Sequence, residues 1–138
     1  MRIWRLVVII LFLPLGAFSQ VASCEFPKLI PFCIFPQPFK VSRVAGRVTD
    51  EEQVSMPDTC VSVFDIAHKP VSHVRTNQDG KFAFPQLLNG KYILVTNYVG
   101  FTPALAELVV GRLGSRRMLH IHMVLSGIDT CSNVDLKK

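Results

Sequence analysis

Four cysteines are the residues of this sequence whose chemistry is easiest to name. Cys24, Cys33, Cys60 and Cys131 form an even set, and an even set in an exported chain favours disulfides over metal ligation or redox catalysis. Of the three possible pairings, we expect Cys24 with Cys33 and Cys60 with Cys131. The first bridge joins near neighbours, and neither disrupts the core of a strand. Closing the second loop, of about 70 residues, would stabilise the fold by about 3 to 5 kcal/mol in the chain-entropy model.

Two histidines have the spacing of metal ligands. His120 and His122 lie two residues apart, so on a strand they share one face, as two ligands of one metal ion do. The competing interpretation is two exposed strand residues on either side of a buried Ile121. A third ligand would have to be His68 or His73, from strands whose proximity the sequence does not establish. We therefore expect no metal or other cofactor, and His120 and His122 are the candidates should a metal bind.

No catalytic motif accompanies these residues. The sequence contains no nucleophile elbow, HExxH motif, phosphate-binding loop or dinucleotide fingerprint. An enzyme needs a nucleophile, a base or a pair of carboxylates held in a pocket. We therefore expect a protein that is not an enzyme and has no catalytic residues.

The N-terminus has the layout of a secretory signal peptide. Arg2 and Arg5 come first, residues 6–18 are then almost wholly apolar, and small residues follow. This order is typical of an export leader, and the apolar part is too short to span a bilayer comfortably. We therefore assign residues 1–23 to a signal peptide and exclude them from the fold.

Two cleavage positions stay open. Small residues permit a cut after Ser19, whereas a cut after Ser23 would follow a segment that resembles a bacterial lipoprotein box in front of Cys24. As a lipoprotein, the chain would carry a lipid on Cys24, would be anchored to a membrane and could form no disulfide there. Either way we expect a protein that is secreted or held in the cell envelope, in the periplasm or on the outer surface.

The charge of the chain says little about its partners. The net charge is +5, and a basic protein can bind nucleic acid or another anionic surface. Apart from Arg112, Arg116, Arg117 and the two terminal lysines, however, the basic residues are scattered along the predicted strands. We therefore expect no nucleic-acid partner, and contact with a membrane only through the leader or a lipid anchor.

Turn residues between short apolar runs identify the secondary structure that positions these groups. Asp79 and Gly80 separate two such runs, and an Asp-Gly pair between strands predicts a β-hairpin. In the second run Phe82 and Phe84 alternate with smaller or charged residues, so both rings should lie on the core face. Another turn, at residues 89–90, precedes a run rich in β-branched and aromatic residues.

The whole chain after the leader is predicted to be β-structure. Seven short strands separated by turn residues favour a β-sandwich over a helical design. The expected strands are 39–49, 60–67, 71–76, 81–84, 91–96, 104–110 and 118–125, and the last places Leu119, Ile121, Met123 and Leu125 on one face. The sequence thus predicts an all-β, antiparallel Greek-key sandwich over residues 40–126, followed by a C-terminal tail at 127–138.

Residues 24–39 are predicted to form an extended arm. Four of the nine prolines lie in this segment, and proline at this density excludes helix and central strand alike. The arm also carries five bulky apolar residues, Phe26, Ile30, Phe32, Phe35 and Phe39. We expect the arm to lie across the sandwich and bury them. The alternative is a strip that binds a partner.

A set of turn and core residues forms a recognisable pattern within residues 44–110. Its members are Gly46, Val48, Asp50, Pro57, Val61, Val63, Thr76, Asp79, Gly80, Phe82, Phe84, Leu87, Gly90, Tyr92, Leu94, Gly100 and Phe101. The pattern resembles the carboxypeptidase regulatory-like domain family. The resemblance implies a transthyretin-like, seven-stranded β-sandwich, also grouped with the prealbumin-like and starch-binding-like folds. It implies that Val61 and Val63 face the core, while Cys60, Ser62 and Phe64 face outward.

The resemblance leaves several functions open. The starch-binding-like group implies carbohydrate binding, for which Phe64, Tyr98 and Phe101 are the aromatic candidates, since the single tryptophan lies in the leader. A small secreted hydrolase of the transthyretin-related kind is less favoured, because the C-terminal Tyr-Arg-Gly-Ser of those enzymes is replaced here by VDLKK. Phe64, Ile93 and Val95 should give the sheet an apolar outer face. We therefore favour a non-enzymatic exported module for binding, adhesion or scaffolding, with a protein or glycan at the cell surface as partner.

Overall fold

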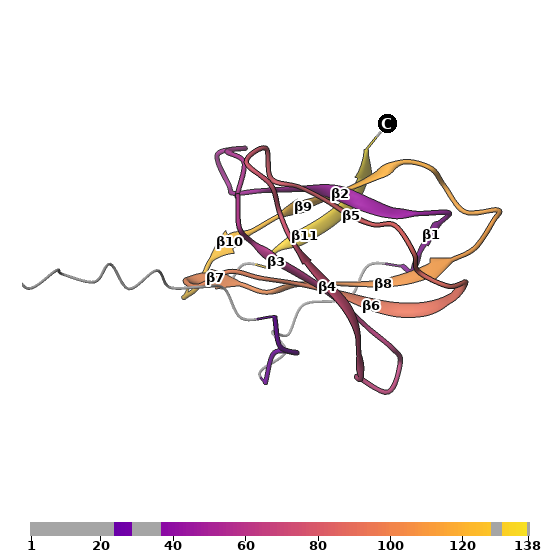
Figure 1. Cartoon of the computed structure of the whole chain (residues 1–138). Helices are drawn as coiled ribbons and strands as arrows, with labels where there is room; N and C mark the ends of the chain where they lie inside the picture. The colour runs from indigo at the N-terminus through magenta and orange to yellow at the C-terminus, as the bar shows by residue number, and fades with distance from the viewer. Residues whose placement is uncertain (1–23, 29–36, 128–130, 138) are drawn as a thin grey trace, which may run out of the picture.

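The computed structural model describes residues 24–28, 37–127 and 131–137 (Figure 1). The predicted signal peptide, its two cleavage positions and Cys33 lie outside these residues. Most of the predicted arm also lies outside them, so the structure tests only its two ends.

The described residues form two larger sheets packed face to face (Figure 1). One sheet has the strand order β1-β8-β6-β3-β4, the other has the order β11-β9-β2-β5, and β7 pairs with β10. The strands are β1 Phe39–Val41, β2 Val44–Thr49, β3 Cys60–Phe64, β4 Pro70–Arg75, β5 Lys81–Phe84, β6 Gly90–Asn97, β7 Phe101–Thr102, β8 Ala104–Val110, β9 Met118–His122, β10 Val124–Leu125 and β11 Asn133–Lys137. Two pairs, β1 with β8 and β2 with β9, run parallel, and the others are antiparallel. The prediction of an all-β sandwich is confirmed. Within the described ranges no helix is long and apolar enough to cross a membrane.

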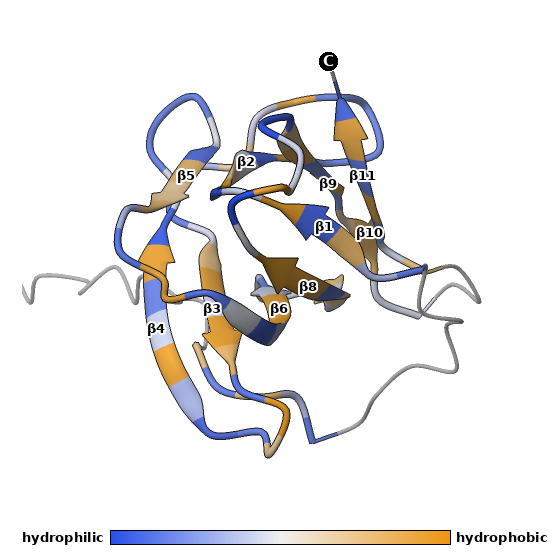
Figure 2. Cartoon of the chain, turned by 90° about the vertical axis from the view of Figure 1, so that its right-hand side faces the viewer, coloured by the Kyte–Doolittle hydropathy of each residue, from blue (hydrophilic) through white to orange (hydrophobic). Residues whose placement is uncertain are grey.

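The core lies between the two larger sheets. Phe82 and Phe84 are buried in it as predicted, together with Val61 and Val63, whereas Tyr92 is only partly buried at its edge. In Figure 2, β3 is coloured mainly as hydrophobic, whereas β4 at the edge of its sheet also carries hydrophilic residues.

Gly46 explains one glycine of the sequence pattern. A Cβ at this position would lie 2.1 Å from the backbone oxygen of Leu119 on the neighbouring strand β9. Only a residue without a side chain permits so close a contact between the strands.

The predicted hairpin at Asp79–Gly80 is wrong. β4 pairs with β3 in one sheet, whereas β5 pairs with β2 in the other, so the turn connects the two sheets. The Asn77 side-chain oxygen accepts hydrogen bonds from the backbone N–H groups of Asp79 and Lys81, and Gly80 has a φ of 72°. This Asx-type turn reverses the chain without holding the flanking strands side by side.

The predicted strand 39–49 is divided in two. Val41 and Val44 are both buried, although residues three apart on a continuous strand point to opposite faces. The chain turns between them, where the backbone N–H of Ser42 donates to the carbonyl of Ser115 at 2.9 Å. β1 therefore joins the five-stranded sheet and β2 the four-stranded sheet.

The predicted strand 118–125 is also interrupted. Leu119, Ile121 and Met123 are fully buried as expected, but Leu125 is 48% exposed. The Met123 backbone N–H still donates to the carbonyl of Thr49, after which the chain leaves β2 and pairs with β7. The predicted alternation therefore ends before Leu125.

The predicted tail contains a strand. β11 pairs antiparallel with β9 along its whole length and forms an edge of the four-stranded sheet. Val134 is buried in the core and Leu136 packs against it. The domain therefore extends beyond the predicted boundary at residue 126.

The start of the arm covers the outer face of β3. Cys24 and Cys60 form a disulfide, so the expected pairings of Cys24 with Cys33 and of Cys60 with Cys131 are wrong. Cys131 is disulfide-bonded as well. A sulfur in a disulfide cannot carry a lipid, so the structure also opposes lipidation of Cys24.

Further contacts hold this cover in place. The Ser62 hydroxyl donates to the carbonyl of Cys24 at 3.0 Å, and the Asn97 side chain donates to that of Glu25 at 2.8 Å. Phe26 packs on Phe64. Cys60, Ser62 and Phe64 do turn away from the sandwich core, but they are buried by the chain itself.

Candidate functional site

The outer face of the four-stranded sheet gathers polar side chains from β2, β9 and β11. Val48, Leu119 and Ile121 of these strands point into the core, so the residues alternating with them point outward. His120 lies beside Arg47 of β2 on one side and opposite Asp135 of β11 on the other. His122 lies beside Thr49 of β2. The predicted histidine pair thus sits in the middle of a sheet rather than on a free edge.

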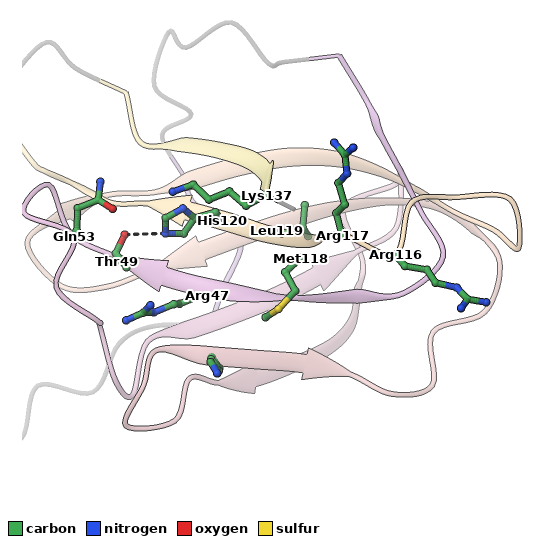
Figure 3. A pocket seen from close by; sticks show the side chains of 10 residues that line it. Arg47, Thr49, Gln53, Arg116, Arg117, Met118, Leu119, His120 and Lys137 are labelled. Carbon is green, nitrogen blue, oxygen red and sulfur yellow. Dashed lines mark hydrogen bonds between the residues drawn. The ribbon is translucent and has the colours of Figure 1, made fainter.

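The two histidines and Thr49 form a compact cluster. The ring centroids of His120 and His122 are 4.1 Å apart. The Thr49 hydroxyl oxygen lies 3.3 Å from Nε2 of His120 (Figure 3) and 3.1 Å from Nδ1 of His122. His120 is only 8% exposed, and its other ring nitrogen, Nδ1, is buried without a hydrogen-bond partner among the described residues.

The surroundings of His120 disfavour its charged form. Burial lowers the pKa of His120 below its ordinary value of 6.5, and the nearby positive charges of His122, Lys137 and Arg47 lower this pKa further. Asp135 opposes the shift. A neutral imidazole keeps a lone pair on one nitrogen, available to a hydrogen-bond donor or a metal ion.

Asp135 completes a group of three possible metal ligands that the sequence did not identify. One ligand atom each from His120, His122 and Asp135 lies within 4.8 Å of the others. The expected third ligands lie elsewhere: His68 stacks on Phe26, and His73 is exposed on β4. Alternation of Val134 and Leu136 around Asp135 was the available signal.

A hollow of about 450 Å³ lies over the same face (Figure 3). Besides Thr49 and His120, five positively charged residues line it: Arg47, Lys81, Arg116, Arg117 and Lys137. No acidic residue is found among the described residues that line it. We call this surface the basic hollow.

Arg47 is fixed at the base of this surface. Its Nε donates to the carbonyl of Asp79 at 3.1 Å, and its guanidinium also donates to the Ser55 hydroxyl. Arg116 and Arg117, by contrast, are exposed in the segment before β9. The hollow therefore combines one positioned guanidinium with two adaptable ones.

The aromatic candidates do not come together. Phe64 is 3% exposed beneath Phe26, which removes it from any surface site. Tyr98 and Phe101 are neighbours, with ring centroids 5.7 Å apart, but Tyr98 is 36% exposed and Phe101 only partly so. Gly100 between them has a φ of 87°, and Gly90 begins β6.

Two packed sheets with this strand order define a transthyretin-like β-sandwich. The chain belongs to the carboxypeptidase regulatory-like domain family, whose sequence model matches residues 43–124. The resemblance drawn from the turn and core residues is thereby confirmed.

Solved structures agree on the fold. The chain is similar to 5-hydroxyisourate hydrolase from Klebsiella pneumoniae, with a TM-score of 0.54 and 18% identity over 70% of this chain and 100% of that one. A second match is 3-chlorocatechol 1,2-dioxygenase from Rhodococcus opacus 1CP, with a TM-score of 0.38 and 11% identity over 86% of this chain and 74% of that one. At these identities the first likeness shows the fold alone, and the second is too low to bear on it. No curated protein sequence matches the chain.

Proposed function

We propose that this chain is an exported, non-enzymatic β-sandwich that binds an anionic glycan at the cell surface through the basic hollow. The observation that carries the proposal is the gathering of five positive side chains, from β2, β5, β11 and the segment before β9, around one hollow. They are scattered in the sequence and converge only because these strands are neighbours.

The chemistry of these groups fits carboxylate or sulfate ligands. A cleft lined by charges of one sign concentrates the electrostatic field and raises the local concentration of an opposite charge. Guanidinium groups bind carboxylate and sulfate oxygens through paired hydrogen bonds. Arg47 is already oriented by two hydrogen bonds, so binding would cost it little conformational freedom.

The other outer face gives less support for a partner site. The apolar residues Phe64 and Val95 form a small cluster with Leu105, but Phe26 of the arm packs on it. The apolar surface that suggested an adhesion partner is therefore covered from within the chain.

Export and the lack of catalysis rest mainly on the sequence. The leader predicts export, and the disulfide between Cys24 and Cys60 is compatible with an oxidising compartment. The sequence contains no catalytic motif. These features support a binding role.

Binding to immobilised glycans tests the proposal. We expect the protein to bind heparin and alginate in a salt-sensitive manner and not to bind neutral dextran. The double variant Arg116→Glu/Arg117→Glu should weaken binding by about tenfold or more, because it replaces two charge-assisted contacts with repulsion. Surface plasmon resonance at two salt concentrations provides the measurement.

A matched variant separates the site from overall charge. Arg43→Glu/Lys69→Glu changes the net charge by the same amount at two exposed residues that do not line the hollow. It should bind as the wild type does. Equal losses in both double variants, or equal binding to dextran, would refute the proposal.

A further inference from the structure

We propose that His120, His122 and Asp135 bind one divalent transition-metal ion, of which Zn²⁺ is the type. This inference does not depend on glycan binding. Two strands of one sheet supply the ligands, and each strand is fixed by its neighbours: β9 lies between β2 and β11.

The positions of the ligands suit a single ion. His120 and His122 project from the same face of β9, and Asp135 stands directly opposite His120 on β11. One ligand atom from each residue lies within 4.8 Å of the others. Around a tetrahedral Zn²⁺ with bonds of about 2.0 to 2.2 Å, ligand atoms are roughly 3.5 Å apart. Small rotations of the side chains are enough to close that difference.

The unpartnered nitrogen of His120 is a second, independent observation. Buried polar atoms in proteins almost always have a partner, yet Nδ1 of His120 has none among the described residues. A metal ion at this nitrogen would satisfy it.

Thr49 is placed to orient both rings for this role. Its hydroxyl oxygen lies within hydrogen-bond distance of Nε2 of His120 and Nδ1 of His122, and a hydroxyl oxygen can accept two N–H donors. That arrangement leaves the lone pair of each ring on its other nitrogen. Ligating histidines commonly have the second nitrogen held by such a partner.

The donor set selects the kind of metal. Two imidazoles and a carboxylate favour Zn²⁺, Cu²⁺ or Ni²⁺, whereas Ca²⁺ and Mg²⁺ prefer oxygen ligands throughout. Arg47 and Lys137 lower the affinity for any cation, and the Asp135 carboxylate offsets part of their charge. Three protein ligands also leave a fourth position open beside the basic hollow.

Calorimetric titration with ZnCl₂ tests the site. The full chain is produced without a histidine tag, with its disulfides formed, freed of metal with EDTA and exchanged into a buffer without phosphate. We expect saturable binding of one Zn²⁺ per chain and no comparable binding of Ca²⁺ or Mg²⁺. Substitution with Co²⁺ should give the visible absorption bands of a four-coordinate site.

Variants assign the ligands. His122→Ala and Asp135→Asn remove side chains less critical to the core than His120, and each should lose the saturable binding. His73→Ala removes an exposed histidine of β4 and should retain it. Thermal unfolding in EDTA checks that all three variants are folded. Absence of binding in the wild type, its retention in both ligand variants, or its loss in His73→Ala would overturn the inference.

Discussion

The ring of Phe26 packs edge-on against the ring of Phe64, with 5.0 Å between the two centroids. Phe26 also stacks on His68 at 4.4 Å. One aromatic residue of the arm thus joins the outer face of β3 to the turn that follows it. The disulfide between Cys24 and Cys60 holds the arm at the same place.

Replacing Phe64 with alanine should destabilise the protein by about 3 to 5 kcal/mol, because the change leaves a cavity beneath the arm. Urea unfolding of the oxidised protein measures the loss. Leu88→Ala, at a side chain that is 80% exposed, should be nearly neutral. Equal effects of the two substitutions would mean that the arm does not bury Phe64.

Peptide mapping of the unreduced protein should recover Cys24 linked to Cys60. The paired variant Cys24→Ser/Cys60→Ser should lose about 4 kcal/mol, since the bridge spans a separation of 36 residues and restricts the unfolded chain. Denaturant midpoints of the two proteins give the difference. A Cys24–Cys33 peptide in the digest would contradict the structure.

Gly46→Ala should cost about 1 to 3 kcal/mol or prevent folding, because the added methyl group would overlap the Leu119 carbonyl and force β2 and β9 apart. Gly111→Ala is the matched control, since a Cβ there meets nothing within 4 Å. Thermal unfolding should separate the two variants clearly. A wild-type melting temperature for Gly46→Ala would show that these strands are not in contact.

The metal-free protein should lose stability as the pH falls below about 6.5. Burial, His122, Lys137 and Arg47 lower the pKa of folded His120, and Asp135 only partly opposes them. The unfolded chain therefore takes up a proton at this residue before the folded protein does. The contribution to stability is complete above the unfolded pKa and is lost as the pH falls from there to the folded pKa.

Urea midpoints at pH 7.5 and pH 5.5 in EDTA measure this effect, in a range above the ordinary titration of carboxylates. His73→Ala should show the same pH dependence as the wild type, because His73 is exposed. Greater stability at pH 5.5 than at pH 7.5 would show that His120 gains a proton favourably in the folded state.

Local patterns predicted which residues point inward. Alternation placed Phe82, Phe84, Leu119 and Ile121 correctly in the core, because a strand turns successive side chains to opposite faces wherever it lies. The same rule could not show where a strand changes sheets. The breaks after Val41 and before Leu125, and the turn at Gly80, depend on partners far away in the sequence.

The candidate site was predicted only in part for the same reason. His120 and His122 are close in sequence, so their spacing identified them. Asp135 joins them only because β11 pairs with β9, and residue 135 fell in the predicted tail. The cysteine pairing failed similarly, since it depends on where the arm crosses β3.

The parallel pairing of β2 with β9 sets an order of events during synthesis. Gly46 must wait for Leu119, and β9 in turn for β11, so the central strand made first is completed by the strands made last. A chain emerging amino-end first therefore holds β2 with an unsatisfied edge until nearly all of it is available. Such distant pairings slow folding, which gives export machinery time to handle the chain while it is still open.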